Sequence, residues 1–151
     1  MKVSLTLSAL LLAAPCAAQE LSTGSVYNSQ PGLSSVAADV HWRAFESALS
    51  PDLDLVVDPG RSTTFASVGG SYRFDMGRWY LEPEAAVGVW AGNVEKRFIG
   101  SRGVAHISGT VGIRITPAAA VELVVSHWSN AFIAMPDEGL NSVGVRVAWR
   151  Y

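Results

Sequence analysis

The sequence predicts an all-β protein, an eight-stranded antiparallel up-and-down β-barrel of the type found in outer membranes. Three observations support this prediction. The chain begins with an export-type segment, its remaining residues alternate between apolar and polar side chains, and short turns alternate with longer loops. Outer-membrane barrels combine strands of about 10 residues with short turns at one end and longer loops at the other.

The composition fits one apolar domain and excludes several classes of protein. Of the 151 residues, 49% are hydrophobic and 16% are charged, and the net charge is −2. Soluble domains usually carry about 25% charged residues, and disordered chains contain fewer apolar ones. A domain that binds nucleic acid would normally be basic. Cys16 is the single cysteine, so a disulfide framework and a cysteine zinc site are both excluded.

Residues 1–18 carry the three parts of a secretory signal peptide. Lys2 provides the positive start, an uncharged apolar run follows, and small residues precede a cleavage position after Ala18. The run is too short for a transmembrane helix, which needs about 20 apolar residues. Acylation of Cys16 in a lipoprotein is the other interpretation, and Pro15 directly before the cysteine argues against it.

Residues 19–151 are expected to form a single barrel domain in which each strand has an apolar and a polar face. In the first clear strand, Val40 and Trp42 share one face, and Arg43 lies on the other. The same alternation recurs along the chain. Eight strands are expected, at residues 23–30, 36–44, 53–58, 64–74, 79–90, 105–115, 121–126 and 143–151.

The connections between these strands and the positions of the aromatic residues favour a membrane barrel. Residues 75–78 and 116–119 are typical of tight turns, whereas residues 92–103 and 130–140 are longer loops. Aromatic side chains are enriched at both membrane interfaces. In this chain they end several of the apolar strand faces: Trp42, Phe74, Trp79, Trp149 and Tyr151.

A soluble, secreted β-sandwich or lipocalin-like barrel is the alternative, because it would show the same alternation with its apolar face inward. The charged residues on the polar faces are Asp39, Arg43, Arg73, Glu82, Glu84, Arg114, Glu122 and Arg146. They would form a buried network inside a narrow membrane barrel, or would face water in a soluble protein. The signal peptide, the aromatic end and a mean hydropathy of +0.25 favour the membrane barrel. Eight strands leave no channel for solutes.

The segment near residue 127 contains the residues that could carry chemistry. His127 and Ser129 are two residues apart, so in a strand they share the apolar, lipid-facing side with Val125. Polar groups on that side are costly unless they are functional or lie at the interface. In acyl transfer, an imidazole takes the serine proton and the oxygen attacks a carbonyl, while Asn130 could donate to the oxyanion. The alternative is a strand that simply becomes polar as it enters a loop.

The remaining titratable residues point to structural roles. His41 and His106 fall on interior faces, where a hydrogen-bonded core histidine is expected rather than a ligand. Glu82 and Glu84 are two residues apart and could suggest paired acid–base chemistry, but with Arg73 and Arg114 on nearby strands an interior salt-bridge network is expected instead. Metal and phosphate motifs are absent from the sequence, so neither a metal nor a cofactor is expected.

His127, Ser129 and Asn130 followed by an alanine, near the end of the penultimate strand of a small exported barrel, resemble the lipid A 3-O-deacylase (PagL) family of Gram-negative outer membranes. Supporting similarity lies at residues 77–83, 95–98 and 136–140 and in the aromatic-terminated last strand. The resemblance implies an eight-stranded barrel that hydrolyses the ester at the 3 position of lipid A. It places the site outside the barrel, at the level of the outer leaflet. Lipid A of lipopolysaccharide is then the partner, nucleic acid is not, and a homodimer is one assembly to consider.

Carried over residue by residue, the resemblance makes Ser129 the nucleophile, His127 the general base and Asn130 an oxyanion donor. The third member of the family triad is an acidic residue, and its position falls on Asn141. Asp137 stands where the family loop usually has an asparagine that binds the oxyanion or shapes the loop.

The amide at position 141 leaves two functions open. Asn141 can orient the imidazole, but it cannot stabilise the imidazolium by charge, and such an exchange costs about 10⁴ in rate in the serine-protease triad. Asp137 or Glu138 could supply the acid if their loop folds back. The first function is an outer-membrane esterase that removes the 3-O-linked hydroxyacyl chain of lipid A. The second is a catalytically degenerate barrel of the same family with a structural or lipid-binding role.

Overall fold

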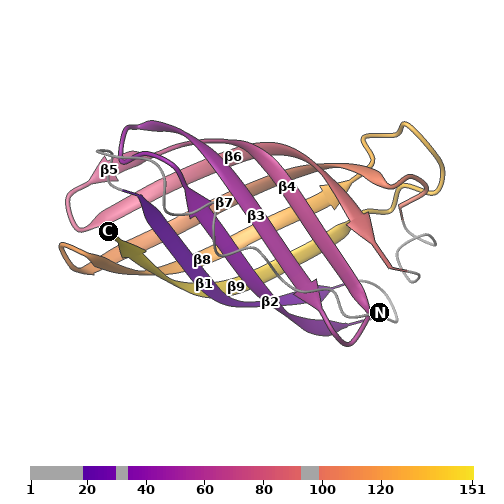
Figure 1. The fold of residues 1–151 in the computed structure, drawn as a ribbon, viewed down its shortest axis with the longest axis horizontal. Helices are drawn as coiled ribbons and strands as arrows, with labels where there is room; N and C mark the ends of the chain where they lie inside the picture. The colour runs from indigo at the N-terminus through magenta and orange to yellow at the C-terminus, as the bar shows by residue number, and fades with distance from the viewer. Residues whose placement is uncertain (1–18, 30–33, 93–98) are drawn as a thin grey trace.

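The computed structural model describes residues 19–29, 34–92 and 99–151 (Figure 1). The expected signal peptide at residues 1–18 and the family-like motif at residues 95–98 lie outside the described residues. Within the described part of the chain, no helix is long and apolar enough to cross a membrane.

The described residues form one closed antiparallel sheet. Its strands are β1 (Glu20–Ser29), β2 (Ser35–Arg43), β3 (Leu49–Asp58), β4 (Thr63–Tyr72), β5 (Phe74–Met76), β6 (Trp79–Ala91), β7 (Gly103–Thr116), β8 (Ala119–Ser129) and β9 (Leu140–Arg150). Each strand pairs with the next along the chain except β4, which pairs with β6, and β1 pairs with β9. The short β5 continues β4 along β6 after a single intervening residue, so the barrel has eight strands. The predicted eight-stranded antiparallel barrel is confirmed.

The connections differ between the two ends of the barrel. Two-residue turns join β5 to β6 and β7 to β8, at what we call the turn end. The longer segment between β8 and β9 lies at the opposite end, together with the end of β6 and the start of β7, and we call this the loop end. Both chain-terminal strands reach the turn end, where Gln19 and Tyr151 exchange two backbone hydrogen bonds of 3.0 Å. In Figure 1 the turn end is on the left and the loop end is on the right.

The alternation of side chains follows the sequence-based prediction. Large apolar residues such as Val68, Val87 and Leu123 are exposed on the outer surface of the strands. The buried charged residues include Asp39, Arg43, Arg73, Glu82, Glu84, Glu122 and Arg146, which the sequence assigned to the inner face. Because a sandwich with a solvated polar face would expose these groups, the soluble alternative is excluded.

Arg114 departs from the expected interior network. It lies near the end of β7, where its guanidinium pairs with the exposed Asp75 and donates to the Gly77 carbonyl oxygen at 2.7 Å. The guanidinium also lies 5.1 Å from the centroid of the buried Tyr80 ring, so Arg114 lies at the edge of the interior and makes its ion pair with the turn.

The barrel interior has two layers. A cluster of buried apolar side chains closes the loop end, and it includes Phe65, Trp90, Ile99, Trp128 and Leu140. The charged network lies beneath it, toward the turn end. Glu82 is a centre of this network, because its carboxylate accepts from Arg73 Nε at 2.6 Å and lies 3.1 Å from Arg43 Nε.

Candidate active site on the lipid-facing wall

The candidate site begins on the outer face of β8, close to the loop end. His127 and Ser129 are half-buried and lie on the same face as Val125, which is 54% exposed. The strand register places His127 opposite Ile107 of β7 and Asn141 of β9. The face predicted from residue parity is therefore the one the structure shows.

Asn141 contacts the His127 ring. The distance between His127 Nδ1 and Asn141 Oδ1 is 2.8 Å. Because a carbonyl oxygen only accepts hydrogen bonds, His127 Nδ1 must carry the hydrogen, and Nε2 of a neutral ring is then free to accept a proton. This is the tautomer that a general base requires.

Gly139 forms the backbone wall behind the histidine. Its φ of +68° lies in the left-handed region that glycine tolerates best. A Cβ atom at this position would lie 2.5 Å from His127 Cε1 and 2.9 Å from His127 Nε2. Glycine therefore leaves the space that the imidazole occupies.

Asp137 organises the loop between β8 and β9. Its Oδ1 accepts from the backbone N–H of Asn130 at 2.8 Å, and its Oδ2 accepts from the backbone N–H of Phe132 at 2.7 Å. Among the described hydrogen bonds and ion pairs, none joins Asp137 or Glu138 to His127. The contact with the histidine is made by Asn141.

Asn130 is buried inside the same loop, with no exposed surface. Its side-chain amide donates to the Ala134 carbonyl oxygen at 2.5 Å. Its backbone N–H is bonded to Asp137. Both kinds of donor on Asn130 are thus engaged within the loop in this conformation.

The Ser129 hydroxyl is near the histidine in sequence but is not bonded to it. Among the described contacts, no hydrogen bond joins Ser129 Oγ to the His127 ring. Catalytic hydrogen bonds are often long before substrate binds and tighten in the substrate complex. Ser129 and His127 share one strand face, so both side chains project to the same side of the barrel wall.

A groove opens on the outer wall beside the histidine. It has a volume of about 310 Å³ and is lined by Ile107, Ser108, Gly109, Val125, Ser126, His127 and Asn141. Gly109 forms its floor, because a Cβ there would meet only Val125 Cγ2, at 3.8 Å. The groove is open to the lipid and its accessible lining is mainly apolar.

Two residues of this site escaped the sequence analysis. Gly109 is an outward-facing residue of β7, and most other outward-facing residues of this strand are large. A glycine in such a row could have predicted a groove at this position. Gly139 offered no such signal, because its approach to His127 depends on how the loop folds.

The fold and this site define an outer-membrane β-barrel with a polar cluster on its lipid-facing wall. The chain belongs to the lipid A 3-O-deacylase (PagL) family, whose family model matches residues 19–150. The expected family is confirmed, and membership supports a location in the outer membrane. No curated protein is similar enough in sequence to match the chain.

Solved structures agree with the fold. The crystal structure of the outer membrane enzyme PagL is 17% identical, with a TM-score of 0.59, and the match covers 88% of this chain and 99% of that one. The N-terminal β-barrel domain of Pseudomonas aeruginosa OprF is 11% identical, with a TM-score of 0.65 and coverage of 89% and 97%. The Yersinia pestis outer membrane protein Ail is 9% identical, with a TM-score of 0.60 and coverage of 90% and 100%. At these identities the likeness concerns the fold alone.

Proposed function

We propose that this chain is an esterase that removes the 3-O-linked hydroxyacyl chain of lipid A at the lipid-facing site on β8. One observation carries the proposal: His127, oriented by Asn141, lies on the same apolar outer wall as Ser129 and beside a groove. Polar groups in contact with lipid are expensive and are usually functional. A substrate that is itself a membrane lipid can reach this wall by lateral diffusion.

The proposed reaction is acyl transfer through Ser129. His127 Nε2 takes the proton from Ser129 Oγ, and Oγ attacks the carbonyl carbon of the ester. The bond from that carbon to the sugar oxygen then breaks, and the proton passes from His127 to this oxygen. Water next attacks the acyl-serine with His127 again as base, which releases the hydroxy fatty acid and restores Ser129.

The groove beside His127 supplies a place for an acyl chain. Each buried CH₂ group contributes about 0.8 kcal/mol on transfer from water, although a chain that leaves the bilayer for the groove gains far less. The groove therefore positions the chain more than it binds it. Positioning of this kind raises the rate by holding the ester carbonyl near the nucleophile.

The oxyanion site is the part of the mechanism that needs movement. Asn130 can donate its side-chain amide to an oxyanion only after leaving the Ala134 carbonyl oxygen. Asp137 accepts two backbone N–H groups of the loop, so we assign it to loop shaping. A conformational change of the β8–β9 loop on lipid binding would complete the site.

Several further proposals follow from family membership. The chain is exported by the signal peptide at residues 1–18, and residues 19–151 form the mature single-domain barrel. Its substrate is lipid A of lipopolysaccharide in the outer leaflet. A homodimer stays a prediction.

The test is the lipid A of cells that export the protein, compared by mass spectrometry with cells that export Ser129→Ala or His127→Ala. We expect loss of the 3-O-linked chain with the wild-type protein and intact lipid A with both variants. Ser25→Ala, which removes an outward-facing serine from β1, is the matched control and should behave like the wild type. Intact lipid A with a folded wild-type protein would contradict the esterase proposal.

A non-catalytic barrel is the second candidate function, and Asn141 is the observation that favours it. This residue contacts His127 without supplying the negative charge of the family acid. Under this alternative the wild type and Ser129→Ala leave lipid A equally intact, while the protein still folds in the outer membrane.

A further inference from the structure

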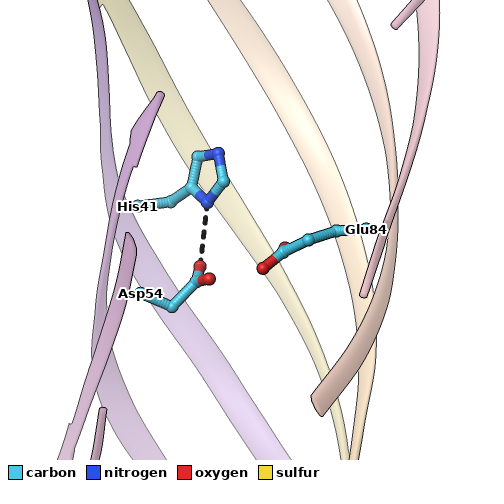
Figure 2. A group of neighbouring side chains, drawn as sticks. All are labelled: His41, Asp54 and Glu84. Carbon is cyan, nitrogen blue, oxygen red and sulfur yellow. Dashed lines mark hydrogen bonds and ion pairs between the residues drawn. The ribbon is translucent and has the colours of Figure 1, made fainter. Parts of the chain in front are cut away.

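The barrel interior holds a group of metal-ligating side chains that the proposed esterase does not use. His41 on β2, Asp54 on β3 and Glu84 on β6 each offer a ligand atom, and these atoms lie within 4.8 Å of one another. Figure 2 shows Glu84 reaching from the opposite wall toward the His41–Asp54 pair. His41 Nδ1 and Asp54 Oδ1 are 2.8 Å apart.

His106 on β7 lies beside this three-residue group. Its Nδ1 lies 3.6 Å from Glu84 Oε1, 3.8 Å from Asp54 Oδ2 and 3.3 Å from Ser67 Oγ. The ring is stacked on Trp128 with 3.9 Å between centroids, which holds its orientation. Two imidazoles and two carboxylates from four strands therefore converge inside the barrel.

Several polar atoms of this set lack a partner. Asp54 Oδ2, Glu84 Oε1 and His41 Nε2 make no hydrogen bond in the described structure. The side chains of His41, Asp54 and Glu84 are only 2%, 3% and 2% exposed. Buried polar atoms without partners lower stability, so such atoms in a native interior call for an explanation.

The surrounding charges also favour a cation. Among the described residues, eight buried carboxylates accompany four buried guanidinium groups. The carboxylates are Glu20, Asp39, Asp52, Asp54, Asp58, Glu82, Glu84 and Glu122. The guanidinium groups are Arg43, Arg61, Arg73 and Arg146. The partly exposed Arg150 adds a fifth, 3.2 Å from Glu20, and Arg146 already lies 3.8 Å from Asp54. Carboxylates still outnumber guanidinium groups, and a bound divalent cation would reduce this excess, which is costly inside a barrel.

The outer contacts suit a bound ion. A cavity of about 10 Å³ lies beside the group, and it is lined by Asp54 and His106 together with Asp39 and Arg146, but not by His41 or Glu84. His41 Nε2 lies 3.9 Å from Glu82 Oε1, and Ser108 Oγ donates to Glu84 Oε2 at 2.7 Å. Carboxylates and hydroxyls commonly orient metal ligands from this outer position.

We propose that His41, Asp54, Glu84 and His106 form a structural site for a divalent first-row transition metal of the Zn²⁺ class. Imidazole nitrogen and carboxylate oxygen are ligands that such ions accept. Such a site would tie β2, β3, β6 and β7 together across the barrel. Ser129 lies on the outer wall, so the metal takes no part in the proposed ester hydrolysis, and either proposal can fail without the other.

The test uses Zn²⁺ as the probe. The untagged mature chain is refolded from urea into detergent micelles with Zn²⁺, passed over a chelating resin, and measured for bound zinc by elemental analysis. We expect about one Zn²⁺ per folded barrel, which is the load of a single closed site. Folding is checked independently by the heat-dependent shift of the barrel on gels.

Glu84→Gln and His41→Gln each remove a metal ligand with little change of volume. Removal of a residue that only hydrogen-bonds to a ligand weakens metal binding roughly 10–100-fold, and we expect these two variants to lose more Zn²⁺ affinity than that. Asp58→Asn is the matched control, because Asp58 is a buried carboxylate 3.4 Å from Arg61 Nε and lies outside both the ligand set and this cavity. It should keep its zinc. Equal zinc retention by Glu84→Gln and Asp58→Asn would overturn the proposal, as would a wild-type barrel without zinc, in which a proton would take the place of the ion.

Co²⁺ in the wild-type chain provides a second measurement if the ligand variants do not fold. We expect the visible absorption of four- or five-coordinate Co²⁺ and imidazole nitrogen in its X-ray absorption spectrum. A spectrum of fully hydrated Co²⁺ would overturn the proposal.

Discussion

His127 depends on Asn141 for its orientation, and the neutral amide sets the expected rate. An amide oxygen holds the Nδ1–H tautomer at 2.8 Å but brings no charge to the imidazolium that forms during attack. In the serine-protease triad, the exchange of acid for amide lowers kcat by about 10⁴. We therefore expect the wild-type enzyme to be slow, and we expect Asn141 to be the cause.

Asn141→Glu should raise the deacylation rate, by a factor of up to about 10⁴, because it restores the charge beside His127. The rate is measured as hydroxy fatty acid released by the purified barrel. Ser29→Glu is the control, since Ser29 pairs with Asn141 across β1 and β9 and places the same charge on the neighbouring strand. An active wild type with no gain from Asn141→Glu would identify Asp137 or Glu138 as the acid.

Gly139→Ala should abolish most activity while the barrel still folds. The new methyl group would meet His127 at 2.5 Å and push the ring out of line. Gly77→Ala is the matched control, because its φ of +71° is similar but nothing lies within 4 Å of the added Cβ. Gly77→Ala should lose about 1–2 kcal/mol of stability from the left-handed backbone. Gly139→Ala should lose more, because its Cβ also lies 2.9 Å from the Trp128 carbonyl oxygen, and only Gly139→Ala should lose turnover. Equal activities of Gly139→Ala and Gly77→Ala would show that the position of the His127 ring does not determine turnover.

At the scale of elements, the outer face of β7 determines what the site can receive. Gly109→Leu fills the groove floor, so it should lower turnover most for substrates with long acyl chains. Release of the fatty acid from substrates of graded chain length measures this. Ala38→Leu adds the same bulk to the outer face of β2, away from the groove, and should leave the chain-length profile unchanged. An unaltered chain-length profile for Gly109→Leu would show that the groove does not hold the acyl chain during the reaction.

The strands were predictable to different degrees. Alternation located β2 and β6 to within about one residue and assigned their faces correctly. It missed the start of β3, which begins at Leu49, because Pro51 is unusual in a strand and the acidic residues near it hide the apolar face. In β3 the inward residues are acidic because they face the charged barrel interior rather than an apolar core.

The site was predictable in part. Residue parity placed His127, Ser129 and Asn141 on one face, since this needs only the period of a strand. The contact between His127 and Asn141 depends on the register of β8 against β9, and the engagement of Asn130 depends on the loop fold. The His41–Asp54–Glu84 group lay beyond sequence reasoning, because it joins strands whose mutual register no local pattern specifies.

At the scale of the whole molecule, the buried charges hold the barrel together. Glu82→Gln leaves Arg73 and Arg43 without a shared carboxylate, and breaking a buried pair costs about 3–5 kcal/mol. The folded fraction in urea, followed by the heat-dependent gel shift, measures the loss. Asp75→Asn removes the partially exposed pair with Arg114 at the turn end and should cost about 0–1 kcal/mol. Equal losses would show that interior pairing does not stabilise this barrel.

The most direct test of catalysis by Ser129 is the product released by the purified, folded barrel from defined lipid A in detergent. Mass spectrometry identifies both the free acid and the position it left. We expect the wild type to release a 3-hydroxy fatty acid from the 3-O position, and Ser129→Ala to release none. Release from another position, or equal release by Ser129→Ala, would contradict the proposed esterase.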